Sequence, residues 1–167
     1  MSLTAKLSVR FQGVESSALD LGTATYAPDN HATYTWTSGT GNDQADLRWS
    51  DSRTIAASSN EDIDLAGSLT DAFGNTLTFV EIKAIKITAD SGNTNNVRVT
   101  RPASNGVPLF LAASDGIDVP PGGTFAFICP EDGHVTVTAG TGDLLNIANS
   151  SSGTSVTYTI EIIGTSA

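Results

Sequence analysis

Residues 155–162 near the C-terminus read SVTYTIEI, so that Val156, Tyr158, Ile160 and Ile162 alternate with polar residues. Successive side chains of a β-strand point to opposite faces, and the alternation therefore predicts a strand with one buried and one solvated face. The intervening threonines are good strand formers, which fits an antiparallel sheet that packs on a core with one side only.

The same two-residue period opens the chain, where residues 5–12 read AKLSVRFQ. We expect a second half-buried strand here, with Lys6 and Arg10 in its outward row. Shorter segments repeat the period at residues 33–36, 46–50, 63–65, 97–99, 125–127, 135–137 and 145–147. Glycine, asparagine and proline turn sequences separate these segments, and helical spacing is limited to one short turn at 68–73.

The spacing of strands and turns predicts an all-β protein, an antiparallel β-sandwich of roughly eight or more strands with jelly-roll-like topology. Another Greek-key sandwich or barrel is the alternative. We expect a single domain over residues 1–167, in which residues 13–30 and 149–153 form loops.

Residues 76–89 depart from strict alternation, because apolar residues occupy both phases of the period. A central strand covered on both sides would produce this pattern. A β-bulge near Lys83 and Ala84 that exchanges the two faces would also produce it, and we favour the bulge.

Composition restricts the partners, since 8 basic and 18 acidic residues give a net charge of −10. Phosphate binding requires clustered Lys and Arg, so we predict no nucleic-acid partner. The N-terminal sequence shows neither a secretory signal nor a membrane span, and we expect no membrane partner. Cys129 follows an apolar run and is predicted to be a free, buried thiol in a chain that folds in a reducing cytoplasm.

Residues for catalysis are sparse, since the chain has only two histidines, His31 and His134. A catalytic metal centre needs several converging ligands, and these two lie far apart in the sequence. The serines lie in turn-like runs, and no Gly-x-Ser-x-Gly elbow occurs. We predict no catalytic residues, no metal and no cofactor. A hydrolase with dispersed carboxylates is the least favoured alternative.

Two acidic clusters could supply the oxygen ligands that calcium prefers. Glu61, Asp62 and Asp64 form one, and Asp115 with Asp118 forms the other. Because apolar residues alternate with these acids around position 63, the carboxylates also fit the solvent face of a strand without an ion.

Trp36 and Trp49 raise the possibility of a carbohydrate-binding module, since sugar rings stack on exposed indoles. Each tryptophan, however, is in phase with an apolar neighbour, Tyr34 or Leu47 respectively. Core packing is therefore the favoured interpretation, and glycan binding is the alternative.

Four stretches carry a resemblance to a known class of proteins. They read GTGNDQADLRW at residues 39–49, EDIDLAGSLTDAFG at 61–74, VTAGTGDLL at 137–145 and SGTSVTY at 152–158. In these turn and strand sequences the chain resembles small virion structural proteins of tailed bacteriophages. The resemblance covers residues 39 to 163 and is weakest over the first 38.

The resemblance implies a capsid decoration, or cement, protein: a β-sandwich homotrimer that binds the major capsid protein and stabilises the head shell. It would be made in the host cytoplasm and lie on the capsid surface of the virion. A tail or fibre component is the first alternative. Capsid surfaces are often acidic, so the scattered cations Lys6, Arg10, Arg98 and Arg101 are the candidates for the partner interface. The alternative is that they are solvated strand residues on one face of a sheet.

Overall fold

The structure, a computed structural model, describes residues 2–167, and strands are the regular elements in that range. The fourteen strands are β1 (Ala5–Gln12), β2 (Glu15–Leu19), β3 (Gly22–Tyr26), β4 (Asp29–Trp36), β5 (Leu47–Ile55), β6 (Asn60–Asp64), β7 (Ala66–Thr70), β8 (Thr76–Thr78), β9 (Glu81–Ala89), β10 (Val97–Thr100), β11 (Gly116–Val119), β12 (Thr124–Ile128), β13 (Leu144–Asn149) and β14 (Val156–Thr165). The predicted all-β class is confirmed.

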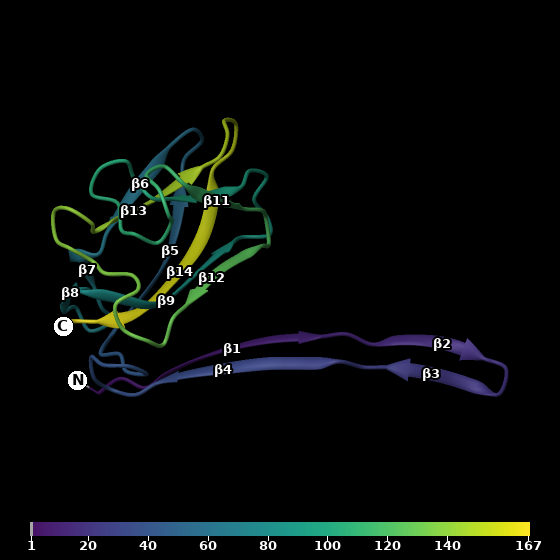
Figure 1. The fold of residues 1–167 in the computed structure, drawn as a ribbon. Helices are drawn as coiled ribbons and strands as arrows, with labels where there is room; N and C mark the ends of the chain where they lie inside the picture. The colour runs from purple at the N-terminus through teal and green to yellow at the C-terminus, as the bar shows by residue number, and fades with distance from the viewer. Residues whose placement is uncertain (1) are drawn as a thin grey trace.

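Two four-stranded antiparallel sheets form the body of the molecule (Figure 1), and the predicted sandwich is confirmed. One sheet has the order β12-β9-β14-β5 and the other has the order β11-β10-β13-β6. The chain passes repeatedly from one sheet to the other, so that neighbouring strands are mostly not consecutive. The inward apolar side chains of both sheets make one core, which includes Trp49, Ile63, Ile87, Val97, Leu145, Ile147, Tyr158, Ile160 and Ile162.

Strand β9 contains the predicted bulge. Its partner β14 places Ile163 opposite Ala84 and Gly164 opposite Ile82, so Lys83 is the extra residue. The exchange of faces lets Ile82 and Ile85, which lie on opposite phases, share the main core, whereas Ala84 is buried in a separate small cluster with Trp36.

A β-hairpin made of β7 and β8 extends the body near β5. The short helical turn expected at residues 68–73 is wrong. The carboxylate of Asp71 accepts hydrogen bonds from the backbone N–H groups of Phe73 and Asn75, both at 2.8 Å, and Gly74 adopts a φ of 84°. These bonds form a tight turn that reverses the chain between two strands.

The first four strands form a two-stranded arm that projects away from the sandwich (Figure 1). Pairing runs in one register from Ala5 opposite Trp36 to Leu19 opposite Gly22. At a rise of about 3.4 Å per residue, this ribbon is roughly 50 Å long. Two expectations are therefore wrong: residues 13–30 are not a loop, and β1 is half-buried only at its beginning.

Candidate functional site

The arm is amphipathic, because alternation along its continuous register sorts the side chains onto two faces. We call the face that carries Leu7, Val9, Phe11, Leu19 and Tyr26 the apolar face of the arm. Its remaining members are Ala5, Gly13, Glu15, Ser17, Gly22, Ala24, Pro28, Asn30, Ala32, Tyr34 and Trp36. Two-stranded ribbons twist strongly, so this face winds around the arm along its length.

The root of the arm is anchored by its apolar face. Ala5 and Trp36 are buried there in a small second core with Ala45 and Ala84 of the body. The ring of Tyr34 stacks on that of Trp36, with centroids 6.5 Å apart. Beyond this point the arm leaves the body, and the same face continues without a cover.

The uncovered part of the apolar face exposes several large side chains. The exposed fractions are 49% for Val9, 81% for Phe11, 62% for Leu19 and 66% for Tyr26, and Leu21 in the terminal turn is fully exposed. Burying a side chain of this size contributes about 1.5–3 kcal/mol. A contiguous apolar stripe on an otherwise polar molecule is typical of a surface that contacts another macromolecule.

The opposite face of the arm is mostly polar and internally bonded, and Val14 is its one large exposed apolar side chain among the described residues. Arg10 donates from Nε and Nη2 to the two carboxylate oxygens of Asp29, at 2.7 and 2.6 Å. This bond raises the pKa of the Arg10 guanidinium above its ordinary value. The hydroxyls of Ser8 and Thr33 lie 3.1 Å apart, and His31 stands opposite Arg10. Cross-strand pairs of this kind stabilise the ribbon itself.

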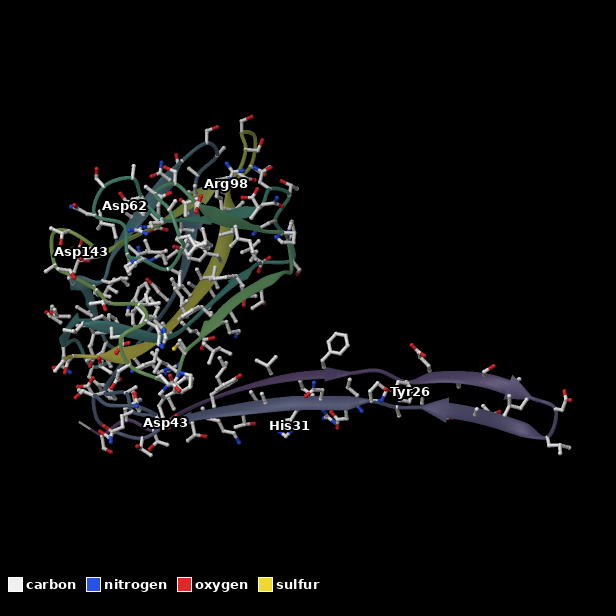
Figure 2. The ribbon with its side chains drawn as sticks, viewed as in Figure 1. Tyr26, His31, Asp43, Asp62, Arg98 and Asp143 are labelled. Atoms are coloured by element: carbon white, nitrogen blue, oxygen red, sulfur yellow. The ribbon has the colours of Figure 1, made fainter. Side chains whose placement is uncertain are left out.

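The four cations predicted to form the partner interface lie in two separate places. Lys6 and Arg10 share the polar face of the arm, whereas Arg98 and Arg101 belong to the body, where Figure 2 shows Arg98 far from the arm. Arg98 binds Asp118 through two hydrogen bonds of 2.7 and 3.0 Å. Arg101 donates to the carbonyl oxygens of residues 110 and 111.

Both tryptophans are buried, as the core interpretation predicts. Trp36 has no exposed surface and Trp49 is 5% exposed. The guanidinium of Arg53 also lies over the Trp49 ring, 5.3 Å from its centroid. Neither indole presents a face on which a sugar ring could stack.

In the acidic clusters considered for calcium, carboxylates accept hydrogen bonds from other groups of the chain. Asp62 accepts from Asn146 Nδ2 at 2.7 Å, and Asp64 accepts from the Ala66 backbone N–H at 2.9 Å. Asp118 is paired with Arg98. Within residues 2–167, His, Cys, Asp and Glu side chains do not gather in groups of three that could hold a metal ion.

A titratable cluster joins the two sheets at Glu61. Its carboxylate accepts from Arg53 Nη1 at 2.6 Å and from the hydroxyl of the buried Tyr158 at 2.9 Å. Burial, reinforced by the bond to Glu61, raises the pKa of Tyr158 well above its ordinary value. We assign the cluster a structural role.

This cluster predicts an alkaline loss of stability. Above about pH 10 the unfolded chain releases the Tyr158 proton while the native state keeps it, so the free energy of unfolding falls as pH rises. Tyr158→Phe should cost about 0.5–1.5 kcal/mol at pH 8, and its deficit relative to wild type should shrink by pH 11. Urea unfolding at both pH values measures the difference.

Tyr26→Phe is the control for this experiment, because Tyr26 is exposed on the arm. Its difference from wild type should be near zero at both pH values. A deficit of Tyr158→Phe that stays constant between pH 8 and pH 11 would contradict the assignment.

The bulge residue Lys83 joins strand β9 to the loop at residues 129–134. Its ammonium group has no exposed surface and lies 3.1 Å from Glu81 Oε2, and it also donates to Asp132. Glu81 Oε1 in turn accepts from the backbone N–H groups of Gly133 and His134. The sequence gives no sign of the pairing between Lys83 and Asp132, since the two residues are 49 positions apart.

The same loop binds the segment that follows the arm. The backbone N–H of Asp43 donates to the carbonyl of Pro130 at 2.9 Å, and that of Asp132 donates to Asn42 Oδ1 at 2.9 Å. Figure 2 shows Asp43 at the arm root. Cys129, predicted to be buried, is only partly so and lies at the start of this loop.

Comparison with known proteins adds no relative: neither the family models, nor the curated proteins, nor the solved structures give a match. Across residues 2–167, no helix has the length and apolar character needed to cross a bilayer. The arm is therefore the feature from which a function can be argued.

Proposed function

We propose that this protein is a non-enzymatic structural component of a tailed-phage virion, a decoration protein that binds the major capsid protein and stabilises the head shell as a homotrimer. The observation that carries the proposal is the arm, whose apolar face is uncovered over most of its length. Exposed large side chains on a projecting ribbon are suited to contact with neighbouring subunits, because burial of each contributes about 1.5–3 kcal/mol.

The division of the molecule agrees with the resemblance. Residues 39–163, which resemble phage virion proteins, make up the body, whereas the first 38 residues, where the resemblance is weakest, contain the arm. Repeated copies on one particle also convert modest contacts into firm attachment.

We assign both faces of the arm to the shell: the apolar face contributes burial, and the polar face contributes cations. Lys6 forms no ion pair within residues 2–167, and Arg10 is held toward the same side by Asp29. An acidic capsid surface would attract both cations, and such contacts weaken as salt increases.

The test is binding of the purified protein to heads of the encoding phage that lack it. We expect the wild type to bind at a fixed copy number and Lys6→Glu combined with Arg10→Glu to lose at least ten-fold in affinity. Arg98→Glu on the body is the charge-matched control for each of the single changes, Lys6→Glu and Arg10→Glu. Cosedimentation measures occupancy, and cryo-electron microscopy of the particles locates the protein.

Density for the protein in the tail would favour the tail or fibre alternative over the head. Wild-type protein that fails to bind any virion surface would overturn the proposed function.

A further inference from the structure

Lys83 presents a buried primary amine to two carboxyl groups. Its side chain has no exposed surface, Glu81 Oε2 lies 3.1 Å from its Nζ atom, and Nζ also donates to Oδ1 of Asp132. A lysine amine in contact with one carboxyl group, with a second carboxyl group beside it to move protons, has the parts of an amide-forming condensation.

The loop that carries Asp132 is fixed to strand β9 on both sides of this contact. The backbone N–H of Cys129 donates to the carbonyl of Lys83 at 2.7 Å. On the other side, the backbone N–H of Ile82 donates to the carbonyl of Val135 at 2.9 Å. Groups held in reacting geometry behave as if present at effective concentrations of up to about 10⁵–10⁸ M, so the fold itself can favour a condensation that is unfavourable between free groups.

Glu81 is placed to relay protons between the amine and the acid. Its Oε1 atom accepts from the backbone N–H groups of Gly133 and His134, at 2.5 and 3.1 Å, while its Oε2 atom faces Nζ. These two residues directly follow Asp132, so the Glu81 carboxylate lies beside both reacting groups. The side chain of Glu81 is 10% exposed and that of Asp132 is 45% exposed. The relay is therefore shielded from solvent, whereas water released at Asp132 can leave.

We propose that Lys83 and Asp132 condense to form an intramolecular isopeptide bond, with Glu81 as the proton relay. One ammonium proton passes through Glu81 to a carboxylate oxygen of Asp132, and the freed Nζ lone pair attacks Cγ. A second Nζ proton follows the same route, the Cγ–O bond breaks with its electron pair on oxygen, and one water molecule leaves. Glu81 ends as the carboxylate it was at the start, and the step is redox-neutral.

The product keeps the contacts of the site. The Nζ–H group replaces the ammonium as a donor to Glu81, whose other oxygen retains its two backbone donors. The bond closes a loop between residues 49 positions apart, which restricts the unfolded chain as a disulfide would. The condensed protein should therefore unfold at a higher urea concentration than its ion-paired form. For a substitution of Lys83, the loss of stability expected from the ion pair alone is then a minimum.

Mass spectrometry of the purified full chain tests the bond and needs no phage particle, so its result is independent of the head-binding experiment. We expect the wild type to be lighter than its sequence mass by one water molecule. Trypsin does not cut after an acylated lysine or before proline, so digestion should yield a product that joins residues 54–86 to residues 99–167. Fragmentation of that product should place the link between Lys83 and Asp132.

Two variants remove the reaction in different ways. Glu81→Gln keeps the shape of the relay side chain but cannot take up a proton, and Asp132→Ala removes the acyl carbon. Both should have their full sequence mass, and trypsin should cut both after Lys83. Because Asp132 is half-exposed, its variant keeps the test valid even if Glu81→Gln fails to fold. Glu131→Ala is the matched control: it removes the neighbouring acid of the same loop, which is 75% exposed, and should leave the bond intact.

The joined tryptic product also distinguishes the isopeptide from a second route to water loss. Asp132 precedes Gly133, and an Asp-Gly sequence can cyclise to a succinimide. A succinimide joins no peptides and leaves Lys83 open to trypsin.

Three results would overturn the proposal. They are a wild type that keeps its full sequence mass after prolonged incubation at neutral pH, a loss of water without a joined product, and a joined product that persists in Asp132→Ala. A bond that still forms at the wild-type rate in Glu81→Gln would overturn the role of Glu81 as the relay.

Discussion

Lys83→Met is expected to lower the free energy of unfolding by about 3–5 kcal/mol, the range typical when one partner of a buried ion pair is removed. The substitution leaves the buried carboxylate of Glu81 without its cation, although Gly133 and His134 still donate to it. The apolar Met side chain is similar in length but cannot neutralise this charge. Urea unfolding followed by tryptophan fluorescence measures the loss.

Lys86→Met is the matched control, because it makes the same replacement three residues along the same strand. Lys86 is 41% exposed and pairs with Glu161 at 2.9 Å on the outer face of the sheet. Exposed pairs contribute about 0–1 kcal/mol, so this variant should remain close to wild type. Equal losses for the two variants would mean that burial does not distinguish the two ion pairs.

The Lys83 variant should also loosen the arm root. The loop at residues 129–134 is held by Lys83 through Asp132 and itself binds Asn42 and Asp43. When that anchor is lost, amide hydrogens of residues 37–46 should exchange faster, while those of β13 in the opposite sheet keep their protection. Native-state hydrogen exchange, measured without denaturant, therefore tests the structural link between the bulge and the arm.

The sandwich could be predicted from the sequence because alternation reports directly on a strand with one buried face. The bulge could be predicted for the same reason, since apolar residues on both phases near Lys83 fit an exchange of faces, although a strand covered on both sides would give the same pattern. The partners of Lys83 could not be predicted, because the sequence does not show which distant loop lies beside the bulge.

The arm shows the limit of that reasoning. Residues 5–12 alternate as a core strand would. The pattern does not distinguish an apolar face that packs on the same chain from an apolar face that stays exposed on it. Residues 13–30 read as a loop because Gly13, Pro28 and small polar residues interrupt the apolar period. The strand-forming threonines and Tyr26 in residues 22–26 were the available signal for β3.

Deletion of the outer arm is expected to weaken attachment strongly and leave the body intact. Replacing residues 13–28 with Asn-Gly joins Gln12 to Asp29, which already face each other in the register, through a two-residue turn suited to a hairpin. The deleted segment is exposed throughout its two strands, so the free energy of unfolding should change by less than about 0.5 kcal/mol.

Binding to heads should respond very differently. The deletion removes Leu19, Leu21 and Tyr26, and loss of even two such contacts, at about 1.5 kcal/mol each, corresponds to a fall of about 100-fold in affinity. Cosedimentation with undecorated heads measures the occupancy, and urea unfolding of the same sample confirms that the body is folded.

A full-length variant with three substitutions separates the effect of arm length from that of the apolar side chains. An arm of natural length in which Leu19, Leu21 and Tyr26 are replaced by Thr keeps the ribbon, since threonine is a good strand former, but removes its apolar contacts. We expect this variant to bind as poorly as the deletion. If it binds as wild type does while the deletion fails, reach rather than burial governs attachment. If both bind normally, the contact with the shell lies in what both variants keep, the sandwich or Lys6 and Arg10 at the base of the arm.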